Sequence, residues 1–256
     1  MSELAERFSV SQVTIRKDLS RLEAADGLQR VHGGAILEAA ELQTPRAQSG
    51  VAEPAFQQRE RKNRLEKRAI GLMAAQLVGD GDSIALDAST TALEVARHLG
   101  GRRELTVITN GIRIALELVG DPGITVLMPG GRLRWEAFSL VGRWGDPLLE
   151  SVNIQKAFVG AVGVTLEKGL TDATHEEAQI KRAMVRAAHE VIAVVDHTKF
   201  GRVALATFAP IEEVGLLISD AGAPPEMAEQ IEARGVEVRL APAPRGGYSG
   251  PPPAGR

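Results

Sequence analysis

The stretch DGDSIALDASTTALEVARHL, residues 80–99, decides the fold of most of this chain. Its first half, Ser83 to Ala88, is a short and mostly apolar run, which is typical of a buried strand. In its second half, from Ala92 to Leu99, apolar residues recur at helical spacing. Ser89-Thr90-Thr91 lies between them, where the helix is expected to begin. The stretch therefore predicts a strand, a hydroxyl-rich turn and a helix.

This turn has the chemistry of an anion seat. The first N–H groups of a helix have no partner within the helix, and the helix dipole places positive charge there. Hydroxyl side chains add further donors, so we expect a phosphate group to bind at this position. The alternative is a helix that is capped by a hydroxyl and binds nothing, which is common.

Strand and helix patterns alternate through the rest of the chain, which predicts an α/β domain. Continuous apolar strands separated by helices indicate a mainly parallel, Rossmann-like sheet that is covered on both faces. The predicted strands are 83–87, 105–109, 124–128, 157–162, 191–195, 214–219 and 236–240. The predicted helices are 66–78, 92–99, 112–119, 176–188 and 225–234.

Polar residues follow several of these strands directly. In parallel sheets, ligands bind at the carboxyl ends of the strands, so we expect these residues to meet at one edge. Hydroxyls, an amide, glycines, a carboxylate and a lysine suit a phosphorylated polyol or sugar. Taken singly, each has a simpler explanation as a turn, a helix cap or a surface lysine. The predicted effector residues are Asp87, Ser89, Thr90, Thr91, Thr109, Asn110, Gly130, Gly131 and Lys199.

The first 37 residues predict a winged helix-turn-helix. A short helix over 2–8 is followed by a second helix that Ser11 caps and whose apolar residues face a core. The run LQRVHGGAIL then predicts two short strands joined at Gly33-Gly34, which form a wing. The alternative is a helical hairpin that only packs on its neighbour. The predicted DNA-binding residues are Ser11, Gln12, Thr14, Arg16, Lys17 and Arg21 on the second helix, and Arg30 and His32 on the wing.

Residues 2–37 closely resemble the winged helix-turn-helix of the DeoR family of bacterial repressors, most clearly in VTIRKDLSRLE and RVHGGA. The segments LDASTT, VITNG, MPGG, SLVG, EEAQIKRAM and DHTKFG resemble the effector domain of that family, which is similar to sugar-phosphate isomerases of the ribose-5-phosphate isomerase type. The resemblance implies a repressor of carbohydrate metabolism that senses a phosphorylated sugar. It also implies a short DNA-binding domain, because family members carry a further helix before this point.

The resemblance places the nine predicted effector residues in the ligand pocket of the family. Glu177 and Lys181 also match a family segment. Their spacing on a helix predicts only a modest ion pair between them, so we expect them outside the pocket.

The composition excludes several classes of protein. The chain has no cysteine, which rules out disulfides and thiolate metal sites, and no apolar run approaches the length of a membrane span. We therefore expect a cytoplasmic protein that does not associate with membranes. The five histidines have no metal-ligand spacing, and the sequence predicts no metal, no cofactor and no catalytic residue.

The predicted organisation is a DNA-binding domain over 1–37, a linker over 38–58, an effector domain over 59–240 and a disordered tail over 241–256. The basic run from Arg59 to Arg68 is expected to be a solvated helix face, or else a contact to DNA phosphates. As partners we expect operator DNA, a phosphorylated sugar and further copies of the chain. Two alternatives stay open: an effector-binding protein with a vestigial DNA module, and an isomerase that uses Asp87 and Lys199.

Overall fold

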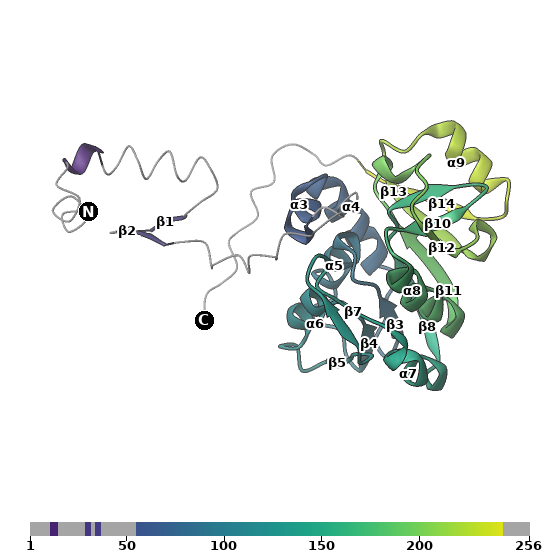
Figure 1. The fold of residues 1–256 in the computed structure, drawn as a ribbon, viewed down its shortest axis with the longest axis horizontal. Helices are drawn as coiled ribbons and strands as arrows, with labels where there is room; N and C mark the ends of the chain where they lie inside the picture. The colour runs from purple at the N-terminus through teal and green to yellow at the C-terminus, as the bar shows by residue number, and fades with distance from the viewer. Residues whose placement is uncertain (1–10, 15–28, 32–33, 37–54, 243–256) are drawn as a thin grey trace. The chain divides into compact units, whose positions relative to one another are not determined.

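The computed structural model describes residues 11–14, 29–31, 34–36 and 55–242 (Figure 1). The chain divides into two compact units, residues 1–49 and 50–256. The predicted helix over 2–8 lies outside the described residues. The predicted disordered tail over 241–256 is wrong at Ala241, which is buried at the end of a strand, and its part after 242 lies outside the described residues.

The described parts of the first unit agree with the predicted pattern. Residues 12–14 are helical, and the Ser11 hydroxyl accepts the backbone N–H of Thr14 at 3.1 Å, as an N-cap does. Strands β1 (Gln29–Val31) and β2 (Gly34–Ile36) pair in antiparallel fashion, which confirms the predicted hairpin. Gly34 is the first residue of β2 and pairs with Val31, so it belongs to a strand and not to the turn.

The second unit is built on a sheet of seven parallel strands, as predicted (Figure 1). The strands are, in sheet order, β14 (Glu237–Ala241), β13 (Leu216–Asp220), β11 (Ala188–Val194), β8 (Ile154–Val159), β3 (Ser83–Leu86), β4 (Leu105–Thr109) and β5 (Ile124–Leu127). From β3 the chain continues outward to β4 and β5, and then returns to place β8 on the other side of β3. The strand order therefore reverses between β3 and β8, and such a reversal is where ligands bind in open α/β sheets.

Helices cover both faces of this sheet. Alternate strand residues face opposite sides: Leu86 packs into one apolar cluster and Ala85 into the other. The first cluster includes residues of the helices α3 to α6, and the second includes residues of α7 to α9. The helices are α3 (Phe56–Arg61), α4 (Arg64–Ala75), α5 (Thr90–Ala96), α6 (Ile112–Leu118), α7 (Asp146–Ser151), α8 (His175–Ala187) and α9 (Pro225–Glu232).

Several short elements were not predicted. Strands β6 (Arg132–Arg134) and β7 (Ser139–Val141) form a hairpin. Strands β12 (Ala206–Ala209), β10 (Gly169–Asp172) and β9 (Gly163–Thr165) form a three-stranded antiparallel sheet. Single-turn 3₁₀ helices include η1 (Arg143–Gly145) and η2 (His197–Lys199).

The basic run from Arg59 to Arg68 is not one solvated helix face. Helix α3 already begins at Phe56, inside the predicted linker, because this ring is buried edge-on against Phe138 with centroids 5.9 Å apart. The run then breaks between α3 and α4 at Asn63, which is left-handed with φ 53°. Lys67 is only 4% exposed, so the prediction of a solvated face is wrong at this residue.

Candidate functional site

The carboxyl ends of β3 and β8 meet at the reversal of strand order. The carboxylate of Asp87, just after β3, accepts the N–H of Gly160, just after β8, at 3.0 Å. It also accepts the N–H of Ser89 at 3.2 Å. The contact is so close that a Cβ atom on Gly160 would lie 2.4 Å from the Ser89 hydroxyl oxygen. Only glycine fits at position 160, because a side chain would push the two strand ends apart.

Lys181 of α8 fills this reversal point. Its ammonium lies 2.6 Å from a carboxylate oxygen of Asp87 and 2.6 Å from one of Asp172, and donates to the Gly160 carbonyl at 2.9 Å. All three charged side chains are buried. Burial alone would lower the pKa of Lys181, but Asp172 and Asp87 outweigh it and raise that pKa. Lys181 is therefore a fixed cation at the end of β3, in contact with Asp87, one of the nine predicted effector residues.

The hydroxyl turn caps α5. Ser89 is the N-cap residue, and its hydroxyl accepts the N–H of Ala92 at 3.1 Å. Thr90 and Thr91 are buried in the first turn of α5, whereas Ser89 is half-buried. The turn thus has the geometry of an ordinary capped helix, and Ser89 is its most accessible hydroxyl.

The next strand end, after β4, is covered by the β6–β7 hairpin. The Thr109 hydroxyl accepts the N–H of Gly111 at 3.0 Å. The side-chain NH₂ of Asn110 donates to the backbone carbonyl of Leu140 at 3.2 Å, and the backbone carbonyl of Asn110 accepts the N–H of Leu140 at 2.8 Å. Asn110 is completely buried, and its amide oxygen has no hydrogen-bond partner among the described residues. An acceptor in this state favours a ligand donor nearby.

A second buried charge cluster holds the hairpin. The Glu177 carboxylate accepts from the Arg134 guanidinium at 2.7 Å and from the Ser139 hydroxyl. Burial raises the pKa of Glu177, against the opposing effect of Lys181. The ion pairs of Lys181 are with Asp87 and Asp172, so the predicted pair between Glu177 and Lys181 is wrong. Glu177 instead contacts the β6–β7 hairpin, and Lys181 contacts residues at the ends of β3 and β10.

Gly130 and Gly131 lie in the exposed turn between β5 and β6. Gly131 has φ 152°, and a Cβ atom there would lie 2.6 Å from the Val141 carbonyl oxygen. The glycine thus permits the tight approach of the hairpin strands. Both residues are accessible from solvent, unlike Asp87 and Asn110.

Lys199 belongs to a separate group of charges at η2. The Asp196 carboxylate accepts the Asn63 amide at 2.9 Å and the N–H of Thr198 at 3.0 Å. Although burial opposes it, hydrogen bonding from Thr198 and the charge of Lys199 lower the pKa of Asp196. Lys199 is half-buried, and burial is the main effect that lowers its pKa. The charge of Asp196 raises this pKa, whereas the neighbouring cations Arg59, Arg202 and Lys62 lower it further.

Lys67 lies beside this group and closes the end of α3. Its ammonium donates to the carbonyls of Arg59 and of Lys62, the latter at 2.6 Å. Burial lowers the pKa of Lys67 to about 8. The charge of Asp196 opposes this shift, and the charge of Lys199 adds to it. Among the described residues of this cationic group at η2, the Lys and Arg side chains therefore outnumber the two acidic ones, Asp196 and Glu60.

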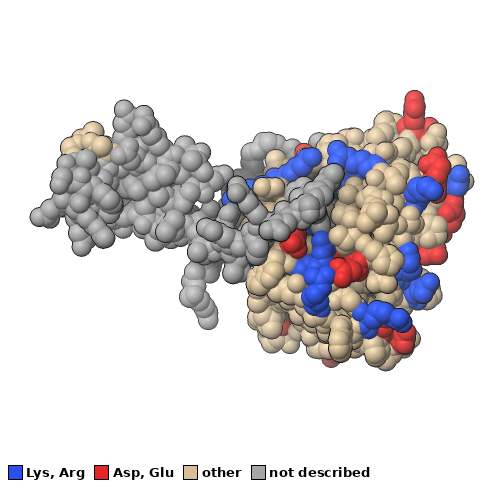
Figure 2. Space-filling view, viewed as in Figure 1, with Lys and Arg blue, Asp and Glu red and all other residues tan. Residues whose placement is uncertain are grey.

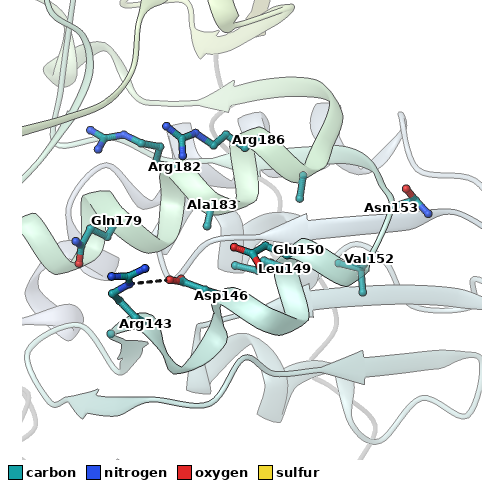
Figure 3. A pocket seen from close by; sticks show the side chains of 12 residues that line it. Arg143, Asp146, Leu149, Glu150, Val152, Asn153, Gln179, Arg182, Ala183 and Arg186 are labelled. Atoms are coloured by element: carbon teal, nitrogen blue, oxygen red, sulfur yellow. Dashed lines mark hydrogen bonds and ion pairs between the residues drawn. The ribbon is translucent and has the colours of Figure 1, made fainter.

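A cleft of about 580 Å³ lies elsewhere, between α7 and α8, and none of the nine predicted effector residues lines it (Figure 3). Among the predicted DNA-binding residues, Ser11, Gln12 and Thr14 are exposed. Arg16, Lys17, Arg21 and His32 lie outside the described residues, and of Arg30 only the backbone is described. On the face of the second unit seen in Figure 2, Lys and Arg side chains lie beside Asp and Glu side chains.

Comparison with known proteins identifies the chain. Residues 62–221 match the model of the DeoR C-terminal sensor domain, and residues 1–40 match the DeoR-like helix-turn-helix domain. The chain is 37% identical over 239 residues to the HTH-type transcriptional regulator GolR of Listeria innocua, covering 93% of this chain and 91% of the relative. This chain belongs to the DeoR family of transcriptional regulators.

A second relative of this DeoR-family regulator is the HTH-type transcriptional repressor GlcR of Bacillus subtilis, 36% identical over 231 residues, or 90% of this chain and 85% of the relative. Among solved structures, ribose 5-phosphate isomerase A of Methanocaldococcus jannaschii matches 54% of this chain and 55% of its own, with 20% identity and a TM-score of 0.41. Within the described part of the regulator, no helix is long and apolar enough to cross a membrane, and no group of three His, Asp or Glu residues could hold a metal ion.

Sequence reasoning missed the charged residues that organise this DeoR-family sensor domain. Lys181 shares a face of α8 with the buried residues Ala178 and Val185, and a lysine at that spacing was a signal of a buried charge. Asp172 gave no signal, because its strand is short. Asn63 gave none either, because its role depends on contact with a residue 133 positions later in the chain.

Proposed function

We propose that this regulator represses genes of carbohydrate metabolism and is released from DNA by a phosphorylated sugar. The observation that carries the proposal is the surplus of positive charge at η2, in a sensor domain that shares its chain with a helix-turn-helix domain. A phosphate dianion would bind Lys199 there through charge-assisted hydrogen bonds. The sugar hydroxyls would reach toward Ser89, Gly130 and Gly131.

Access to the buried part of the predicted site would require the β6–β7 hairpin to move. Asn110 lies beneath Leu140 of that hairpin, and its unpartnered amide oxygen would gain a hydroxyl donor if the hairpin opened. Asp87 and Thr109 lie at the ends of the neighbouring strands β3 and β4, and Thr90 and Thr91 begin α5. Effector binding would thus favour a second arrangement of the hairpin, and only a ligand that prefers one arrangement can shift the equilibrium between them.

At the DNA end, we propose that two or more copies act together in the cytoplasm on repeated half-sites of an operator. The second helix would enter the major groove with Ser11, Gln12, Thr14, Arg16, Lys17 and Arg21. The wing would contact the backbone or the minor groove with Arg30 and His32. The part of the predicted linker over 38–58 that precedes α3 would transmit the change in the sensor domain.

Two substitutions separate the DNA-binding and sensing roles. Arg16→Ala is expected to weaken operator binding at least about tenfold, or 1.4 kcal/mol, because it removes a cation from the groove-facing side of the helix. Lys199→Ala is expected to leave operator binding unchanged and to weaken effector affinity by a similar factor. Mobility shift with the chain's own upstream DNA measures the first effect. Thermal stability against a panel of sugar phosphates measures the second, since a ligand at 100 times its Kd adds about 2.7 kcal/mol.

The matched control is Lys168→Ala, which removes an exposed lysine from the turn between β9 and β10. It is expected to change neither affinity. Unchanged effector affinity in Lys199→Ala would overturn the assignment of the phosphate seat. Absence of operator binding in the wild-type chain would favour an effector-binding protein with a vestigial DNA module.

Effector binding is also expected to take up protons at pH 8. Lys67 has a pKa of about 8, so it is about half-protonated there, and a phosphate beside Lys199 would raise the pKa of both lysines. The phosphate itself is already dianionic at this pH. Calorimetry in buffers of different ionisation enthalpy measures the uptake, which is expected to fall in Lys67→Met. Equal proton uptake by the wild type and by Lys67→Met would contradict the placement of the phosphate beside Lys199 and Lys67.

We propose that the chain is not an isomerase. An aldose–ketose isomerase needs a carboxylate base that can accept a substrate proton. Asp87, the candidate base, has one oxygen on the Ser89 N–H and the other on Gly160 and Lys181. Incubation with ribose 5-phosphate, followed by an assay for ribulose 5-phosphate, tests this: turnover above the blank would restore the enzyme hypothesis.

A further inference from the structure

The cleft between α7 and α8 has walls of opposite charge (Figure 3). Its floor is apolar, with the buried Leu149 and the half-buried Ala183 among the lining residues. Arg182 and Arg186 stand one turn apart on α8 and form a cationic rim. Asp146 and Glu150 lie along α7, and because Arg143 pairs with Asp146, this acidic rim carries, among the described residues, one uncompensated negative charge, that of Glu150.

Two of these four charged side chains have no ion-pair or hydrogen-bond partner within the described part of the second unit. There, Arg182 donates to the Thr207 carbonyl and Asp146 pairs with Arg143 at 3.1 Å. Arg186 and Glu150 are exposed and make no ion pair with any described residue. Trp144, which follows Arg143 in the chain, is 81% exposed and does not itself line the cleft. An exposed aromatic residue next to a charged cleft is typical of an interface.

We propose that this cleft is the contact between two copies of the chain, related by a two-fold axis parallel to the cleft. Such an axis keeps each residue at its level along the cleft and exchanges the two rims. The cationic rim of one copy then faces the acidic rim of the other, so that Arg186 meets Glu150 of the other copy. The proposal rests on the proposed function only in that a regulator of repeated half-sites acts as an oligomer.

The direction of the two helices supports this pairing. Arg143 and Gln179 lie at one end of the cleft and Asn153 at the other (Figure 3). Both helices therefore run the same way along it, which brings Glu150 and Arg186 to similar levels. A small anion would be a poorer occupant, because it could pair with Arg186 but would leave Glu150 without a partner.

Charge reversal tests the interface on the full chain, without DNA or effector. Glu150→Arg and Arg186→Glu are each expected to weaken self-association about tenfold or more, because each places like charges opposite one another. The double variant Glu150→Arg/Arg186→Glu is expected to recover wild-type self-association, since it exchanges the rims. Trp144→Ser is expected to weaken it as well. Sedimentation velocity measures the dissociation constants, with Lys168→Glu as the control reversal.

The outcomes are distinguishable. If the wild type associates and the single reversals associate equally well, this interface is wrong while the proposed oligomer stands. A monomeric wild type would overturn both. Failure of the double variant to recover, although its circular dichroism and thermal midpoint match the wild type, would overturn the pairing of Arg186 with Glu150. Inorganic phosphate binding that Arg186→Glu abolishes, with self-association unchanged, would identify a small-anion site instead.

Discussion

Replacing Lys181 by methionine is expected to destabilise the second unit by about 3–5 kcal/mol at pH 7. The methionine fills the space of the lysine chain but leaves Asp87 and Asp172 as two buried carboxylates without a counter-charge. It also removes the donor to the Gly160 carbonyl. Urea unfolding followed by circular dichroism measures the loss.

Lys168→Met, at an exposed position, should stay within about 0.5 kcal/mol of the wild type, and an equally small effect of Lys181→Met would contradict the buried cluster.

Gly160→Ala is expected to cost about 1–3 kcal/mol from overpacking alone. The added Cβ atom would lie 2.4 Å from the Ser89 hydroxyl oxygen and 2.5 Å from the Ser89 Cβ atom. Rotating the hydroxyl does not relieve the second contact, so the ends of β3 and β8 must separate. The bond from the Gly160 N–H to Asp87 would lengthen as a result. Urea unfolding measures the loss of stability.

The matched control is Gly100→Ala, because a Cβ atom at Gly100 would have no neighbour within 4 Å. This substitution is expected to be neutral or slightly stabilising, since it only restricts the unfolded chain. A second variant, Gly160→Ala with Ser89→Gly, should recover part of the stability by removing the atoms that clash. If Gly160→Ala were as stable as Gly100→Ala, the close contact at the strand reversal would be wrong.

The parallel sheet could be predicted because its strands are apolar on both faces. The run LTVIT gives β4 with its observed bounds, Leu105–Thr109, since four of its five residues are β-branched and favour a strand. The prediction for β8 began three residues late, at Ala157, because Gln155 and Lys156 interrupt the apolar pattern near the exposed end of the strand. The elements themselves follow from local pattern, and their ends depend on which residues reach solvent.

The short strands could not be predicted, because three or four residues carry too little periodicity. In β6, buried Arg134 pairs with Glu177 of α8, and this partner is 43 positions away. The same limit applies to the candidate site. The rule that strand ends converge indicated which residues share the sheet edge, but their burial depends on a hairpin and a lysine from elsewhere in the chain.

The bond between Asn63 and Asp196 has a mechanical consequence. Asn63 lies directly after α3, the first described helix of the second unit, and Asp196 begins the turn that carries Lys199. A displacement of that turn must therefore either break this hydrogen bond or move the start of α4 with it. Hydrogen exchange at the backbone amide of Asn63 would measure such a movement.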